Sequence, residues 1–182
     1  MKDLIELSKP LDINQIDFRV QSINKGGYAT ILAYKDARAD MNRLDDVVGP
    51  LGWKREHING NSNCIVSIWN EEIKQWVSKE DTGTESAAEK QKGLASDSFK
   101  RACFNWGIGR ELYDYPIIKI KLTEKEFDQT TKKPTWDFKL KEWKWSSQFT
   151  NGELTFLFCK DENDNIRFKM GQYIKPETEK QK

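Results

Sequence analysis

The segment SAAEKQKGLASDSFKRACFNW, residues 86–106, combines two patterns that point to chemistry on a helix surface. Apolar residues recur at spacings that place them on one face of a helix: Ala88, Leu94, Ala95, Phe99, Ala102, Cys103 and Trp106. The opposite face carries the cations Lys100 and Arg101, with Lys90 and Gly93 earlier on a similar bearing. Because Gly93 has no side chain, a polyanion backbone can approach these cations closely.

The composition limits the classes of function that the chain can have. Its 182 residues include 30 Lys and Arg and 29 Asp and Glu, for a net charge of +1. Any attraction for nucleic acid must therefore be local. The sequence has neither a secretory leader nor a run of about 18 apolar residues that could span a bilayer. We expect a soluble, cytoplasmic protein with no membrane partner.

Residues that could perform catalysis or bind a metal are few and scattered. The three cysteines are isolated and are expected to be reduced packing thiols: Cys64, Cys103 and Cys159. The single histidine, His57, argues against a histidine-based metal site, although a carboxylate-only site stays open. The adjacent carboxylates at 45–46 and 71–72 do not converge on one site. With no nucleophile–base arrangement and no P-loop, the sequence predicts no enzyme, no metal and no cofactor.

The periodicity predicts an α+β fold in which helices pack on antiparallel sheet. An amphipathic helix is expected from Ala37 to Val48, with Asp36 as its N-cap and a stop at Gly49. A short helical lead-in is expected over residues 1–12. Alternation and turn residues predict strands over nine segments: 17–23, 28–34, 53–58, 64–69, 75–81, 117–122, 136–149, 153–159 and 166–170.

The long helix is expected to begin at a capping box formed by Ser86 and Glu89 and to end at Gly107. Three strands before it form a meander. We therefore expect a core over residues 1–115, and a β-rich extension over 116–172 that completes the same domain. The polar residues 173–182 are predicted to form a disordered tail.

Two blocks, in order and separated by the meander, carry a family likeness. The first is VVGPLGW, residues 47–53, and the second runs from Ser96 to Ala102 and is followed by Trp106 and Gly107. Over residues 14–115 the chain resembles the Rad-fifty-two superfamily of single-strand annealing proteins, and looks closest to its phage Sak-type branch. Residues 116–182 lie outside the resemblance.

The resemblance implies a fold, an activity and an assembly. The fold is an antiparallel meander with a long helix packed across it. The activity is binding of single-stranded DNA and annealing of complementary strands without ATP, in homologous recombination and DNA repair. The protomers form a homo-oligomeric ring or filament with DNA in a basic outer groove. The implied setting is a bacterial host cell, if the protein is phage-encoded, and the implied partner is a single-stranded-DNA-binding protein.

The resemblance also implies site residues. The Lys–Arg pair that holds the DNA backbone in the family matches Lys100 and Arg101. Arg38 is the nearest candidate for a basic residue early in the first helix. One basic position of eukaryotic relatives is Asn105 here, which departs from the family pattern.

Each candidate cation also has a structural interpretation. Asp97 could pair with Lys100 or Arg101 along the helix, and Arg38 could equally be an ion-pair partner. Arg110 could complement the end of the long helix or contact DNA at the rim of the groove.

Two further surfaces stay open as sequence predictions. Lys54 and Arg55 alternate along a strand, so only one of them can face DNA; Lys54 is included among the predicted DNA contacts. The stretch WDFKLKEWKW, residues 136–145, could bind bases and phosphates, form a subunit interface or be an amphipathic strand.

One alternative function has the same fold. The near-neutral charge favours, by a small margin, a nucleic-acid-binding or protein-binding adaptor that does not anneal strands. A carboxylate-dependent nuclease would be a third class, without positive support in the sequence.

Overall fold

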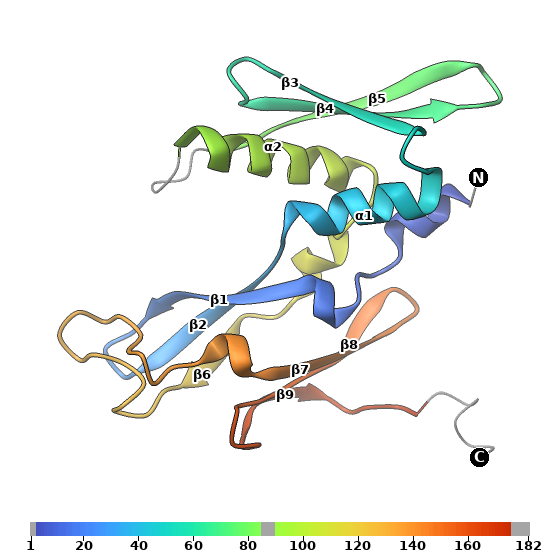
Figure 1. The fold of residues 1–182 in the computed structure, drawn as a ribbon. Coiled ribbons are helices and arrows are strands. Elements are labelled where there is room, and N and C mark those ends of the chain that lie inside the picture. The colour runs from blue at the N-terminus through green and yellow to red at the C-terminus, as the bar shows by residue number, and fades with distance from the viewer. Residues whose placement is uncertain (1–2, 85–89, 176–182) are drawn as a thin grey trace. The chain divides into compact units, whose positions relative to one another are not determined.

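A computed structural model describes residues 3–84 and 90–175, without the side chains of 90–92. Within these residues the fold is α+β, with two α-helices and three antiparallel three-stranded sheets (Figure 1). The elements, where η marks a 3-10 helix, are η1 (Leu4–Ser8), η2 (Ile13–Gln15), β1 (Ile16–Ile23), β2 (Tyr28–Lys35), α1 (Ala37–Val48), β3 (Trp53–Ile58), β4 (Asn63–Asn70), β5 (Gln75–Thr82), α2 (Lys90–Asn105), η3 (Arg110–Asp114), β6 (Ile118–Lys121), η4 (Leu140–Glu142), β7 (Lys144–Thr150), β8 (Glu153–Lys160) and β9 (Ile166–Gly171).

The elements belong to two compact units, each made of two separate stretches of chain. Unit 1 comprises Met1–Leu11 and Lys35–Arg110, and unit 2 comprises Asp12–Tyr34 and Glu111–Lys182. Unit 1 contains both α-helices and the β3–β4–β5 sheet. Unit 2 contains the β1–β2–β6 and β7–β8–β9 sheets.

Local signals set the boundaries of α1 and of the β3–β4 hairpin. The Asp36 carboxylate accepts a hydrogen bond from the Arg38 backbone N–H, as an N-cap does. Gly49, with φ of 81°, follows the last turn of α1. Asn59, Gly60 and Asn61, with φ of 51°, 62° and 71°, have left-handed backbone conformations in the turn between β3 and β4. These elements confirm the sequence predictions for this part of the chain.

Side chains of α2 pack on one face of the β3–β4–β5 sheet. Phe99 is 1% exposed, and its ring lies 6.1 Å from the Trp53 ring of β3. The Trp106 indole N–H donates to the Val66 carbonyl of β4 at 3.0 Å. The expected capping box at Ser86 and Glu89 lies outside the described residues.

The core of unit 1 contains a buried ion pair. The Lys35 ammonium donates to the Asp40 carboxylate, and also to the Ile108 carbonyl at 2.7 Å. It lies 4.1 Å from the centre of the Phe104 ring. Burial raises the pKa of Asp40 to about 6, although Lys35 opposes this change. The pair joins the end of β2 to α1 and to the turn that follows α2.

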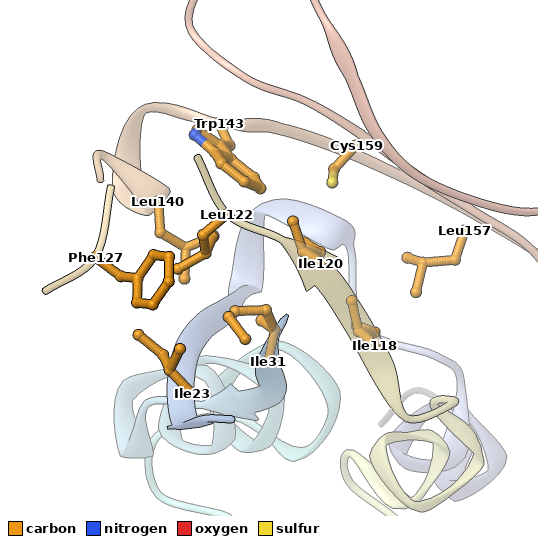
Figure 2. Close-up of a cluster of buried hydrophobic side chains, with 11 residues drawn as sticks. Ile23, Ile31, Ile118, Ile120, Leu122, Phe127, Leu140, Trp143, Leu157 and Cys159 are labelled. Carbon is orange, nitrogen blue, oxygen red and sulfur yellow. The ribbon is translucent and has the colours of Figure 1, made fainter. Parts of the chain in front are cut away.

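The core of unit 2 lies where β6 meets β8 and their neighbours (Figure 2). Ile118 and Ile120 of β6 point in the same direction as Ile31 of β2, and Leu157 and Cys159 of β8 approach them. The cluster comprises Ile23, Ala29, Ile31, Ile118, Ile120, Leu122, Phe127, Leu140, Trp143, Leu157 and Cys159. Alternate residues of β2 and β6 are therefore committed to the interior, and the residues between them point outward.

Unit 2 also holds a group of charged side chains that satisfy one another. Arg167 donates to both carboxylate oxygens of Glu126, at 2.7 and 2.9 Å, and to Asp161 at 3.2 Å. The guanidinium lies 4.5 Å from the Trp143 ring. Burial disfavours the charged carboxylates, but hydrogen bonds, including those from Arg167, keep the pKa of each below its usual range.

The prediction of a single strand over residues 136–149 is wrong. The chain instead forms η4 and begins β7 at Lys144. This break allows Trp143 to enter the core, where it is 6% exposed. Trp145 stacks on Phe18 at 3.6 Å between ring centres. The alternation of Trp and Lys in this stretch thus reflects burial through a turn and not one continuous strand.

The lead-in expected over residues 1–12 forms a 3-10 helix, η1. Among the described residues, no helix is long and apolar enough to cross a membrane.

Candidate functional site

Three cations from three elements of unit 1 lie around the first turns of α1, and we call them the α1 cluster: Arg38, Arg55 and Lys100. The Arg38 guanidinium contacts the Asp36 carboxylate at 2.9 Å, and this contact lowers the pKa of Asp36, with a smaller contribution from Lys100. Arg55 places a guanidinium nitrogen 3.9 Å from the Met41 sulfur, one helical turn beyond Arg38. The cluster therefore combines cations from α1, β3 and α2.

The two neighbouring cations of β3 lie on opposite faces of the sheet. Arg55 lies opposite the buried Val66, and its guanidinium is 4.8 Å from the Phe99 ring of α2. Lys54 lies on the other face, with its ammonium 4.8 Å from the Trp76 ring. The structure thus groups Arg55, and not Lys54, with Lys100.

Arg101 follows Lys100 in α2 but has a partner of its own. Its guanidinium lies 3.3 Å from the Asp81 carboxylate of β5, and its side chain is 41% exposed. Asn105, one turn later, also donates to Asp81 at 3.3 Å. The local partner suggested by the sequence, Asp97, instead accepts a hydrogen bond from the Thr84 backbone.

Two further arginines contact backbone carbonyls. Arg110 donates to the Phe104 and Asn105 carbonyls at 2.6 and 3.0 Å, which satisfies the end of α2. Arg43 donates to the Glu6 and Lys9 carbonyls at 2.8 and 2.7 Å. The structure therefore gives Arg110 the helix-end contact that the sequence allowed.

Lys90 is the first residue of α2, and its side chain lies outside the described part of the chain. Its predicted DNA contact stays a prediction.

Unit 2 presents a second basic surface, which we call the sheet face. It consists of outward-pointing side chains of the β1–β2–β6 sheet: Arg19, Tyr28, Tyr34, Lys119 and Lys121. In the β2–β6 register Tyr28 lies opposite Lys121, and Thr30 lies opposite Lys119, so these side chains share one face. Tyr28 and Tyr34 are 46% and 36% exposed.

Cations and rings contact each other on the sheet face. The Arg19 guanidinium lies 5.5 Å from the Tyr34 ring centre, and the Lys121 ammonium lies 4.9 Å from that of Tyr28. Asp17 contributes one carboxylate to the same side of β1, two residues before Arg19. Cations held beside exposed rings suit a ligand that has both negative charge and flat surfaces.

The sheet face is absent from the sequence predictions, although the sequence carries a signal for it. The IKIK alternation of β6 places Lys119 and Lys121 together on the face opposite to its two core isoleucines. What the sequence lacked was the pairing partner of β6. Only the register with β2 brings the lysines beside Tyr28.

The aromatic stretch 136–145 divides in the structure. Trp143 and Trp145 pack inside unit 2, whereas Trp136 is 99% exposed. This stretch therefore does not form one interleaved aromatic and basic surface.

Within the described residues, no group of three or more His, Cys, Asp and Glu side chains could hold a metal ion. The two basic surfaces offer ionic contacts to phosphate groups, and the sheet face adds stacking.

Comparison with known proteins gives one informative likeness. The chain is 32% identical over 113 residues to the single-stranded DNA-binding protein DdrA of Deinococcus radiodurans. The match covers 60% of this chain and 54% of DdrA, so the chain spans about half the length of that relative. No family model matches the chain. The chain is therefore similar to DdrA over part of its length.

Proposed function

We propose that this protein binds single-stranded DNA and anneals complementary strands without ATP. The observation that carries the proposal is the similarity to a protein named for single-stranded DNA binding. The α1 cluster and the sheet face support it, because both present cations that can contact phosphates. The motif resemblance to the Rad-fifty-two superfamily, closest to its Sak-type branch, supports the annealing step.

The proposed chemistry is electrostatic and has no covalent step. Lys100, Arg55 and Arg38 hold the sugar-phosphate backbone in a basic groove and leave base edges accessible. A second strand then samples registers until correct pairing stabilises the duplex. Sequence specificity resides in base pairing, since contacts to phosphates do not distinguish bases.

The proposed working form is a homo-oligomeric ring or filament. One protomer has a net charge of only +1, and each phosphate contact contributes only about −0.7 to the salt slope on single strands. Side-by-side protomers would join their clusters into one track, so binding at one protomer raises the effective concentration at the next. A recruiting single-stranded-DNA-binding protein is a further part of this proposal.

The decisive experiment mixes two complementary labelled oligonucleotides with the protein, without ATP, and follows pairing by energy transfer. We expect strong acceleration over the protein-free rate and no signal with non-complementary strands. Lys100→Ala should reduce the acceleration, whereas Lys169→Ala makes the same charge change on an exposed residue of β9 and should not. Equal rates with and without wild-type protein would refute annealing.

The non-annealing adaptor is retained as the second candidate because the net charge is near neutral. It predicts binding of single strands or of a protein with no acceleration of pairing. Light scattering separates the assemblies: the annealing proposal expects a large oligomer, and a monomer with and without DNA would contradict it.

A further inference from the structure

A cavity of about 470 Å³ lies in unit 2 at the outer edge of β1. Aromatic side chains from β1, β2 and the chain around η4 form much of its lining, and polar residues complete it. The residues that matter for its chemistry are Asp17, Phe18, Tyr34, Lys141, Trp143 and Trp145.

The aromatic part of the cavity is flat and held in place by the fold. The Phe18 and Trp145 rings stack at 3.6 Å with 6° between their planes, and Trp143 is 6% exposed. Because these rings are already packed, little side-chain entropy would be lost when a planar ligand binds against them. The cavity is about three times the volume of the ~150 Å³ cavity known to hold benzene.

The charged groups of the cavity argue against a phosphate as its occupant. Asp17 contributes a carboxylate and Lys141 an ammonium. A dianion would meet repulsion from Asp17, whereas a neutral ring with both donors and acceptors could use both groups. Nucleobases have this chemistry, and unstacked bases bind proteins by stacking on aromatic side chains.

The cavity shares Tyr34 with the sheet face. Tyr34 lines the cavity and also lies beside Arg19, whose guanidinium is 5.5 Å from the Tyr34 ring centre. Asp17 and Arg19 are two residues apart and point to the same side of β1. A strand whose phosphates contact Arg19 would therefore carry its bases past the entrance of the cavity.

We infer that this cavity receives one unstacked nucleobase of a single strand whose backbone lies on the sheet face. The inference rests on the proposed function, since it names a subsite for the same ligand. It assigns Tyr34 as a wall for the base, with Asp17 and Lys141 as polar groups at its edge. Part of the affinity for single-stranded DNA should then depend on the presence of bases and not on the salt concentration.

The test compares oligothymidylate with an abasic strand of equal length and equal phosphate number. Wild-type protein should prefer the strand with bases by about tenfold, in the range measured for stacking of one base. Tyr34→Leu should remove most of this preference while the affinity for the abasic strand stays unchanged. Asp17→Ala should reduce the preference, and Glu153→Ala, which removes an exposed carboxylate of β8, should not.

A second readout locates the base directly. Strands with bases should quench tryptophan fluorescence more than abasic strands, and Trp145→Phe, which keeps a stacked ring on Phe18, should diminish that difference. Circular dichroism would verify that each variant is folded. Equal wild-type affinity for both strands, or an unchanged preference in Tyr34→Leu, would overturn the base site and leave the proposed function intact. Failure to bind either strand at low salt would refute the proposed function itself.

Discussion

The α1 cluster and the sheet face both present cations, but the aromatic rings beside those cations differ in their exposure. In the α1 cluster the neighbouring ring of Phe99 is buried, so the ligand meets cations without an open aromatic surface. On the sheet face Tyr28 and Tyr34 are exposed beside their cations. The α1 cluster suits phosphates alone, and the sheet face suits phosphates and bases.

The units that carry these surfaces also differ in how they hold buried charge. Unit 1 uses one pair, Lys35 and Asp40, whose side chains are 1% and 0% exposed. Unit 2 uses Arg167 with two carboxylates, and its side chain is 12% exposed. The predictions below test these differences, from the largest expected effect to the smallest.

Asp40→Ala should cause the largest effect, a loss of about 3–5 kcal/mol in the free energy of unfolding, because it leaves the Lys35 charge buried without its carboxylate. Urea unfolding followed by tryptophan fluorescence measures this loss. The double variant Lys35→Met with Asp40→Leu should recover much of the stability, since it removes both charges. A loss below about 1 kcal/mol in the single variant would mean that water reaches the pair.

A fall in pH should change the stability contributions of the buried carboxylates in the two units in opposite directions. The pKa of Glu126 and of Asp161 is lowered in the fold, so their contribution to stability is present above the unfolded values of 4.5 and 3.8. It is lost as pH falls through the lower folded values. The pKa of Asp40 is raised from 3.8 to about 6, so its contribution decreases as pH rises through that interval.

Unfolding free energies measured from pH 3 to pH 7 test this difference. Arg167→Met should flatten the acid-side loss, whereas Glu153→Ala should leave the wild-type profile in place. An unchanged profile in Arg167→Met would show that the network does not cause the acid dependence.

Lys100→Ala should weaken binding of every single strand about fivefold, the equivalent of about 1 kcal/mol for one ionic contact. It should flatten the salt slope by about 0.7. Arg101→Ala should act in the same direction but less strongly, because Asp81 already holds that guanidinium. Fluorescence anisotropy at several salt concentrations measures both quantities. Wild-type affinity and slope in Lys100→Ala would remove the α1 cluster from the DNA interface.

Arg19→Ala should lower affinity by about threefold and the salt slope by about 0.7, which is the effect of one phosphate contact on the sheet face. Arg19→Lys should retain most of the slope because it retains the charge. If both variants bind as the wild type does, the sheet face serves another partner.

Lys54→Ala should have the smallest effect. Lys54 lies on the face of β3 opposite to Arg55, beside Trp76. We expect less than a twofold change in affinity, within the range of ordinary surface substitutions. A loss equal to that in Lys100→Ala would place DNA on both faces of the sheet.

Elements with strong local signals could be predicted from the sequence. Asp36 and Gly49 delimit α1, and Asn59 with Gly60 begins the turn between β3 and β4, because each of these residues acts through its own neighbours. The prediction of one strand over residues 136–149 was wrong because η4 brings Trp143 into the core. The core contacts that stabilise this turn come from residues distant in sequence.

The candidate site was harder to predict, because its geometry depends on contacts between distant residues. The pairing of Arg101 with Asp81, 20 residues earlier, has no local pattern. The sequence shows that Lys54 and Arg55 lie on opposite faces of β3, but only the position of α2 shows which face each one occupies. Sequence reasoning could select cations, but their grouping into the α1 cluster required the fold.

The division of the chain between the units has a consequence for synthesis. Unit 1 has all its segments once Arg110 has left the ribosome, whereas β6, which supplies Lys119 and Lys121, begins only at Ile118. Chains emerge from the N-terminus, and compact units can fold as they are completed. A nascent chain that stops between these two points carries the α1 cluster without a finished sheet face. Translation thus orders the appearance of the two surfaces in time.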